Sequence, residues 1–386
     1  MQQSAITRST LRGRAGALGF GITLTLAAAT SAAEADSDYE IWAIDQGTNQ
    51  VHIYNPALEE VARIDLVAEG VRTAHMVDFT ADHAYAFIAS PGSGDVTVIR
   101  SADRAVVARL ATGPRTHMAT ASSDDSRAIA AVIGAPDTPG DGKLIEILVD
   151  TANESFTIGR TLVVAEDPLV QEKAERFSET QPICQEFTAD GRHAYATLGP
   201  ELGEGGVVVL DLESFQLVAA YPVDEVQASC GTVRTGNGRH MFVNGGSADV
   251  GVFYVFDTST HRVVHQADTR GKDAHGVWPT PDGSEIWMVN RVTSNAVVID
   301  AETFEITAEM DFVGKTPDII AMSPDGRAYI SLRGPEPVTM PHVAIGETPG
   351  FAVVDVAARE LIEVIQPAEG DPKSDFHGIG VRLIHD

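Results

Sequence analysis

Histidines recur at one fixed position of a repeated sequence unit. Each unit contains a turn built on Asp or Asn, at Asp82, Asp124, Asp190, Asn237, Asp282 and Asp325. The residues seven positions before these turns are His75, His117, Ile183, Cys230, His275 and Asp318. A seventh copy of the same context, Phe-His-Gly-Ile, places His377 near the C-terminus. Four of the 12 histidines therefore share one register with an aspartate and a cysteine.

These side-chain types are metal ligands. Neutral imidazole suits Cu, Zn, Fe and Ni, and a nearby thiolate favours Cu or Zn. We therefore predict a copper or zinc site with the ligands His75, His117, His275, His377, Asp318 and Cys230. Two alternatives stay open. The histidines can line a channel and bond a carbonyl group or water, or one imidazole can act as an acid or base without a metal.

Other polar side chains come close to this register. Arg72 stands three residues before His75, and Arg115 stands two residues before His117. Asn290 and Arg333 end the predicted strands that follow two of the turns. A guanidinium can hold an anion through two parallel hydrogen bonds. These four residues are therefore candidates for binding a cofactor or ligand. The alternative is that the arginines pair with the many carboxylates of the chain.

The chain has two cysteines, Cys184 and Cys230. They lie in neighbouring repeats, on the predicted strands that lead into the Asp190 and Asn237 turns. In an oxidising compartment, such a pair forms a disulfide when its Cα atoms approach within about 7 Å. The two thiols are also candidate metal ligands, or free structural thiols. The sequence leaves these three alternatives open.

The elements around the register repeat with a regular period. Successive turns are 42 to 47 residues apart, with one interval of 66. A β-rich run follows the turns, as in Ala328-Tyr-Ile-Ser331, and another ends in Asp, as in Phe253-Tyr-Val-Phe-Asp257. A unit of four short strands that repeats every 40–50 residues, roughly, is typical of a β-propeller. We count seven inner strands, the last of which completes the first blade. The expected fold is an all-β, seven-bladed propeller closed by its two ends.

The repeat resembles that of the YVTN/YncE-type β-propeller family, whose units read approximately Pro-x-Gly-hydrophobic, Ser-Pro-Asp-Gly, Tyr-Val-Thr-Asn and Val-x-Val-Ile-Asp. The most similar copies here are residues 274–283 with 286–290, and residues 316–326 with 328–331. The resemblance spans nearly the whole chain after the first 35 residues and implies the propeller architecture. It implies no single activity, because propellers carry many unrelated functions.

The first 35 residues have the pattern of a secretory signal peptide. Arg8, Arg12 and Arg14 precede an apolar run, and Ala33-Glu-Ala35 offers a cleavage site. We expect residues 1–35 to be removed on export, residues 36–386 to form the propeller, and the protein to be periplasmic or secreted. No later stretch is apolar enough to span a membrane. The net charge of −28 argues against nucleic acid and anionic lipid as partners.

Extra chain length falls at the face where inner strands begin. Residues 134–143, 153–182, 333–350 and 366–376 all connect strands there. Long loops on one face of a rigid scaffold often carry a site. We therefore expect a monomer that binds a small molecule, metal or protein at this face. Haem and nucleotide motifs are absent from the sequence. These features predict a periplasmic binding protein with a metal site. The alternative is a copper-dependent periplasmic oxidoreductase that uses the histidine ring.

Overall fold

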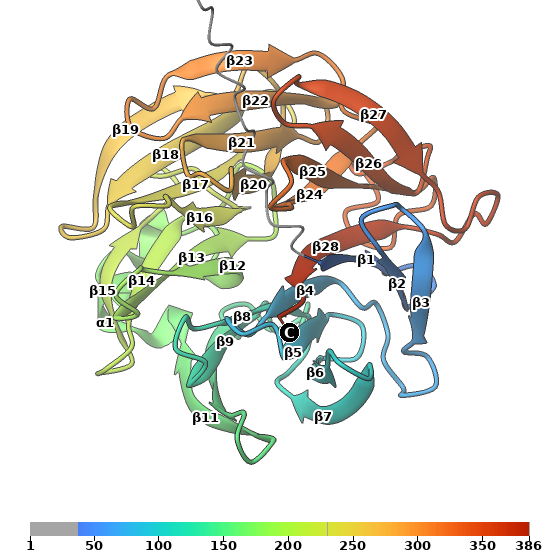
Figure 1. Cartoon of the computed structure of the whole chain (residues 1–386). Coiled ribbons are helices and arrows are strands. Elements are labelled where there is room, and N and C mark those ends of the chain that lie inside the picture. Colours follow the sequence, from blue (N-terminus) through green and yellow to red (C-terminus); the bar gives the residue numbers. More distant parts are fainter. Residues whose placement is uncertain (1–37, 230, 386) are drawn as a thin grey trace, which may run out of the picture. The chain divides into compact units, whose positions relative to one another are not determined.

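The described chain is a ring of antiparallel β-sheets. The computed structural model describes residues 38–229 and 231–385. Over these residues it has seven sheets of four strands each, arranged around a common axis (Figure 1). Contacts between the inner strands of successive sheets close the ring. The prediction of an all-β, seven-bladed propeller is confirmed.

The strands fall into four concentric sets. The inner strands are β4 (Met76–Phe79), β8 (Thr116–Ala121), β12 (Gln181–Phe187), β16 (Thr232–Arg234), β20 (Ala274–Pro279), β24 (Pro317–Met322) and β28 (Phe376–Leu383). The second strands are β1 (Tyr39–Asp45), β5 (Tyr85–Ser90), β9 (Arg127–Val132), β13 (His193–Gly199), β17 (His240–Gly246), β21 (Glu285–Asn290) and β25 (Arg327–Leu332). The third strands are β2 (Gln50–Tyr54), β6 (Asp95–Arg100), β10 (Lys143–Asp150), β14 (Val207–Asp211), β18 (Gly251–Asp257), β22 (Asn295–Asp300) and β26 (Gly350–Asp355). The outer strands are β3 (Glu60–Asp65), β7 (Ala105–Ala111), β11 (Ser155–Val163), β15 (Gln216–Tyr221), β19 (Arg262–Asp268), β23 (Ile306–Met310) and β27 (Glu360–Ile365).

The two ends of the described chain meet in one sheet. Its strand order is β28-β1-β2-β3, so the last strand supplies the inner strand of the first blade. β28 and β1 are antiparallel, with Trp42 opposite Gly380 and Ile41 opposite Val381. This pairing removes the free edges that an unclosed blade would expose, and it confirms the predicted closure.

Burial explains which residues form each strand. The second strand β5 is buried along its whole length, because neighbouring sheets cover both of its faces. The outer strand β7 is only half-buried, and its one polar residue, Arg109, is exposed. Side chains of adjacent blades share a core, as where Phe87 and Val98 pack with Ala130 and Ile147. This packing fixes the blades against one another and thereby the positions of the inner strands.

The Asp turns set the register of each inner strand. Asp82 Oδ1 accepts hydrogen bonds from the Thr80 hydroxyl at 2.7 Å and the Ala84 amide at 2.9 Å. Asp282 closes the equivalent turn of another blade through Thr280 at 2.6 Å. Because the turns are alike, a residue seven positions earlier falls at the start of its inner strand. We call the end of the propeller with these turns the turn face, and the opposite end the ring face.

Glycines let the inner strands approach closely near the ring face. A side chain at Gly276 would collide with the Asp318 carbonyl oxygen, and one at Gly378 would lie 2.5 Å from the His75 carbonyl oxygen. The Gly378 amide donates a hydrogen bond to that same oxygen at 2.8 Å. The glycine after a ring histidine is therefore required by backbone packing between blades.

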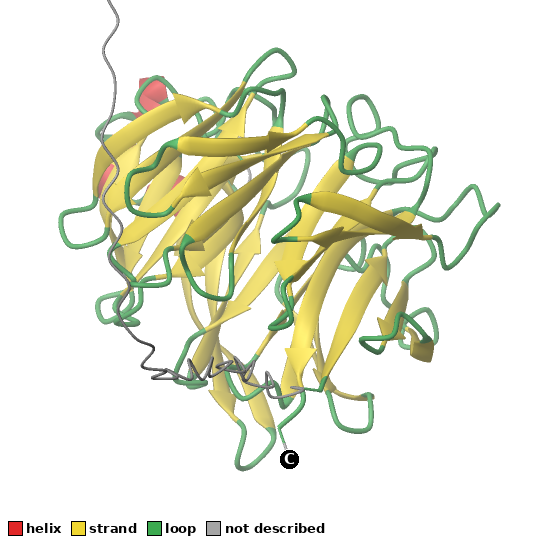
Figure 2. Cartoon of the chain, turned by 45° about the horizontal axis from the view of Figure 1, so that its top comes forward, coloured by secondary structure: helices red, strands yellow, loops and turns green. Residues whose placement is uncertain are grey.

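The long connections lie at the ring face, but the predicted insertion 153–182 is wrong in its first part, because residues 155–163 form the outer strand β11. Connections at the turn face have four or five residues each. At the ring face, residues 164–180 contain the short helices η1 (Val164–Glu166), α1 (Pro168–Gln171) and η2 (Ala174–Arg176), and residues 333–349 form a long loop. Figure 2 shows these connections around the strands. Within the described residues, no helix is long and apolar enough to cross a membrane. The predicted signal peptide lies outside the described residues.

Candidate metal site at the propeller axis

The histidine register becomes a cluster of four buried side chains and the half-buried His117. The residues that meet there, called the ring residues below, are His75, His117, His275, Asp318 and His377. His75 directly precedes β4, and each of the others is the second residue of its inner strand. Asp318 is fully buried. His75, His275 and His377 are buried too, and the largest exposed fraction among them is 9%, at His275. Five of the six predicted ligands are thus brought together. The sixth, Cys230, lies outside the described residues.

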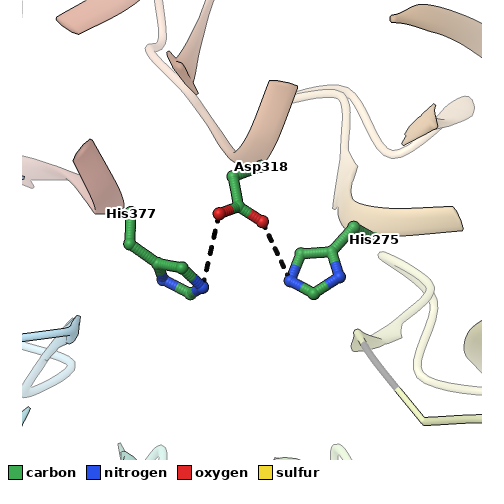
Figure 3. A group of neighbouring side chains, drawn as sticks. All are labelled: His275, Asp318 and His377. Carbon is green, nitrogen blue, oxygen red and sulfur yellow. Dashed lines mark ion pairs between the residues drawn. The ribbon is translucent and has the colours of Figure 1, made fainter. Parts of the chain in front are cut away.

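Asp318 joins two of the histidines. Its Oδ1 lies 3.0 Å from His275 Nε2, and its Oδ2 lies 3.5 Å from His377 Nε2. Figure 3 shows both imidazole rings turned towards the carboxylate between them. One ligand atom from each residue falls within 4.8 Å of the other two. This buried His/Asp/His cluster could hold a metal ion.

His75 and His117 form the second half of the ring, and their Nε2 atoms lie 3.0 Å apart. His75 Nδ1 is 2.7 Å from Gln46 Oε1. The Gln46 amide is oriented by its own Nε2, which donates to Asp375 Oδ2 at 2.8 Å. His117 Nδ1 is 3.1 Å from the Ile183 carbonyl oxygen. Both Nδ1 atoms face acceptors, so both carry the ring proton.

The consequence is an electrostatic conflict at the Nε2 atoms. In a neutral imidazole, one ring nitrogen is the donor and the other is the acceptor. With their protons on Nδ1, His75 and His117 point two lone pairs at each other across 3.0 Å. A positive species between these atoms relieves the repulsion, and the candidates are a shared proton and a metal ion.

Ring stacking connects the two halves. The His75 and His377 rings stack with centroids 3.6 Å apart and an interplanar angle of 26°. His377 also meets His117 edge-on at 6.2 Å and His275 edge-on at 5.9 Å. The Nδ1 atom of His377 is buried, with no hydrogen-bond partner among the described residues. The four imidazoles therefore form one continuous cluster.

Burial keeps three of these imidazoles neutral. The pKa values of His75 and His377 lie well below the ordinary histidine value, chiefly because burial disfavours the charged ring. Burial, together with the nearby His275, lowers the pKa of His117 to about 4. Neutral imidazole is the form that binds metal.

A network of buried ion pairs surrounds Asp318. Arg333 NH1 donates to Asp318 Oδ2 at 2.8 Å, and its Nε donates to Asp375 Oδ1 at 2.8 Å. Arg291 Nε donates to Asp273 Oδ2 at 2.7 Å, and its NH1 lies 3.4 Å from Asp318 Oδ1. Burial alone would raise the pKa of Asp318, but the adjacent histidines and guanidiniums hold it well below the ordinary value. The three carboxylates and two guanidiniums of this network leave one net negative charge beside the imidazoles.

The four residues predicted to bind a cofactor or ligand separate in space. Arg72 is exposed and donates to a backbone carbonyl at 3.0 Å. Arg115 also donates to a backbone carbonyl, at 2.7 Å. Asn290 is buried and bonds the side chain and carbonyl of Thr269. Of the four, Arg333 contacts a ring residue, and its planar fork is occupied by the two oxygens of Asp375.

Several residues of this network were missed at the level of sequence. Gln46 and Arg291 each directly follow a second strand, as does Arg333, which was predicted. Asp273 and Asp375 each stand two positions before a ring histidine, in the two Asp-x-His-Gly stretches of the chain. Both signals are visible in the sequence once second strands are aligned in the same way as inner strands.

Cys184 lies on β12, next to the ring position occupied by Ile183. It is a buried, free thiol rather than half of a disulfide. Burial raises its pKa to about 12, so it is protonated at neutral pH. Its backbone amide bonds the Thr197 hydroxyl at 3.3 Å.

Comparisons with known proteins agree with the fold. No family model and no curated relative matches the sequence. Dihydro-heme d1 dehydrogenase NirN, solved in complex with DHE, is 17% identical, with a TM-score of 0.56 over 90% of this chain and 75% of that one. Hydrazine synthase of Kuenenia stuttgartiensis is 13% identical, with a TM-score of 0.58 over 88% and 99%. The β-propeller domain of Cps50 (Swd1) from Myceliophteria thermophila is 11% identical, with a TM-score of 0.55 over 75% and 89%. At these identities the likeness shows the propeller fold alone.

Proposed function

We propose that this protein is an exported β-propeller of the YVTN/YncE type that binds a copper or zinc ion with its ring residues. The observation that carries the proposal is the 3.0 Å separation of the His75 and His117 Nε2 atoms, whose Nδ1 protons are both engaged elsewhere. Two metal–nitrogen bonds of about 2.0–2.1 Å span this separation at an angle close to a right angle. The pair therefore fits two ligands of one ion.

The surrounding charges favour a cation over a neutral occupant. The ion-pair network leaves one net negative charge next to the ring. His275, Asp318 and His377 form a neighbouring cluster on the adjoining strands, in which one ligand atom from each lies within 4.8 Å of the other two. Imidazole nitrogens with one carboxylate suit Zn²⁺ and Cu²⁺.

The partners of the ligating rings also fit a metal site. A metal-bound histidine usually donates its other N–H to a carbonyl or carboxylate, which fixes the tautomer. Gln46 Oε1 does this for His75, and the Ile183 carbonyl does it for His117. Bound metal would supply Lewis acidity or redox chemistry at the axis. The ring residues would hold the ion, and the buried arginines would position Asp318.

The same proposal includes the setting of the protein. A sequence with a leader-like start and a charge of −28 fits a monomer in the periplasm or outside the cell, with no nucleic acid partner. The loop-rich ring face is the place for a small-molecule or protein partner. Turnover of a substrate by bound copper would extend this binding function to an oxidoreductase.

Metal content tests the proposal. The full chain is expressed with its own leader, recovered from the periplasm and analysed for transition metals, beside a His75→Ala/His117→Ala variant. His342→Ala is the matched control, because this exposed histidine lies in a loop of the same face. We expect about one copper or zinc per chain in the native protein and the control, and loss of the metal in the double variant. Metal-free native protein that also fails to take up Cu²⁺ or Zn²⁺ after chelation would overturn the proposal. Circular dichroism checks that the variants fold.

A further inference from the structure

A second candidate site lies at the turn face, away from the ring. A cavity of about 1040 Å³ opens there, lined by the ends of inner strands and by the Asp turns. None of the ring residues lines it. Its volume is sufficient for a small organic molecule. The lining residues that carry the argument are Asp78, Glu186, Arg234 and Trp278.

The inner part of the cavity has excess negative charge. Glu186 and Arg234 form an ion pair at 2.5 Å. Asp78 Oδ2 accepts a hydrogen bond from the Ala121 amide at 2.8 Å, and no ion pair joins it to a lysine or arginine of the described chain. Among the described residues that line the cavity, Arg234 is the sole lysine or arginine. The three inner side chains therefore sum to one negative charge.

This count applies above about pH 7, where Asp78 is ionised, so binding is to be measured at pH 8 or above. Burial and the Glu186 carboxylate together raise the pKa of Asp78 to about 7, against the hydrogen bond from the Ala121 amide. Burial raises the pKa of Glu186 as well. His83, another lining residue, has a pKa lowered to about 4 by burial, so it adds no positive charge. The rim residues Asp282, Asp300 and Glu302 are acidic too.

Trp278 gives the cavity an aromatic wall. Its side chain is 38% exposed, whereas Trp42 and Trp287 are fully buried. An indole face attracts cations and packs against their apolar substituents. A hydrated metal ion would gain little from this wall, and an anion would be repelled by the carboxylates.

We propose that this cavity binds a small organic cation with a single positive charge, such as a quaternary ammonium compound, whose charge lies against Asp78 and whose alkyl groups contact Trp278. The charge balances the net charge of the inner lining. The acidic rim raises the local concentration of such a cation. The site is separate from the ring, so its test does not depend on metal.

Choline is the probe, and 3,3-dimethylbutan-1-ol is its uncharged analogue of the same shape. The chain has three tryptophans, and two are fully buried, so acrylamide quenching of fluorescence reports on Trp278. We expect choline to protect this fluorescence saturably and the neutral alcohol to have no such effect. Asp78→Asn should weaken choline binding about tenfold, since a charge-assisted contact is lost. Asp78→Glu, which restores the carboxylate, should recover most of it.

Asp137→Asn is the matched control, because it removes the same charge from an exposed loop of the ring face. It should bind choline as the native protein does. Equal protection by choline and the neutral alcohol would overturn the proposal, as would unchanged choline affinity in Asp78→Asn. Absence of any saturable choline effect on the native protein would overturn it too. Thermal unfolding confirms that each variant is folded before titration.

Discussion

The Nε2 atoms of His75 and His117 face each other across 3.0 Å, although the two rings come from different blades and each has its Nδ1 bonded elsewhere. Blade packing, and not local sequence, brings them together. The backbone approach at Gly378, whose amide bonds the His75 carbonyl, fixes one of the two strands. The pair is therefore held in place before any ion arrives, which lowers the cost of organising a metal site.

The first prediction concerns Gln46, which orients His75 without belonging to the proposed ligands. Gln46→Ala removes the acceptor for His75 Nδ1–H, and with it the fixed tautomer. Loss of such a partner typically weakens metal binding by about 10–100-fold. Competition with a chelator of known affinity measures the change, and the absorption or EPR spectrum of the copper form should shift with it. Gln216→Ala, an exposed glutamine on an outer strand, is the control. Equal metal affinity and spectra in both variants would contradict the orienting role.

The second prediction concerns the buried ion pairs. Arg333→Met leaves Asp318 and Asp375 without their shared guanidinium. Removing one partner of a buried pair costs about 3–5 kcal/mol, so the free energy of unfolding should fall by that amount. Urea denaturation measures it. Arg63→Met breaks an exposed pair with Glu60 at 2.7 Å and should cost less than about 1 kcal/mol. Similar losses in the two variants would show that Arg333 is not needed to neutralise the site.

The third prediction concerns metal removal. An ion that binds only the folded state stabilises it by about 2.7 kcal/mol at a free concentration 100 times its dissociation constant. Chelation should therefore lower the Tm, and Cu²⁺ or Zn²⁺ should restore it. In the His75→Ala/His117→Ala variant, the Tm should no longer respond to either treatment. A Tm that responds to the metal equally in both proteins would place the binding elsewhere on the chain.

The fourth prediction concerns pH and Asp78, which faces Glu186 and Arg234 across the cavity. Its pKa is about 7 in the folded protein and 3.8 in an unfolded chain. The folded state binds the extra proton between these values, so stability from this group declines as pH rises from about 4 to about 7. Asp78→Asn removes that decline.

Urea unfolding at pH 4.5 and pH 8 measures the effect. Because water in the cavity screens the charge, we expect Asp78→Asn to gain about 1–2 kcal/mol relative to the native protein between the two pH values. The Asp137→Asn control should gain nothing. A constant difference between native protein and Asp78→Asn would contradict the raised pKa.

The architecture could be predicted from the sequence because each propeller blade repeats the same short-range pattern of turns and strands. The turn at Asp82 and its copies are short-range structures, so counting back from them located His75 and its equivalents without knowledge of the fold. The same count placed His117, His275 and Asp318 at one end of the axis, and the matching context Phe-His-Gly-Ile placed His377 there, where the structure has them.

Counting from the turns could not predict the side-chain contacts between blades. Gln46 lies 29 positions from His75, and Arg333 lies 42 from Asp375, so no local pattern pairs them. Their partners depend on side-chain length and on the angle between blades. Arg72 and Arg115 show the opposite case, since their closeness in sequence to ring histidines does not bring them into the ring: each bonds a backbone carbonyl. The cavity at the turn face could not be predicted from the sequence either, because its lining comes from several blades.

Anomalous X-ray diffraction from crystals of the protein, recorded at the copper and zinc absorption edges, tests the metal site most directly. We predict one strong anomalous peak within about 2.0–2.1 Å of the Nε2 atoms of both His75 and His117. Absence of a peak there, with the two nitrogens still about 3 Å apart after crystals are soaked in Cu²⁺ or Zn²⁺, would mean that a shared proton holds the pair and would contradict the metal site.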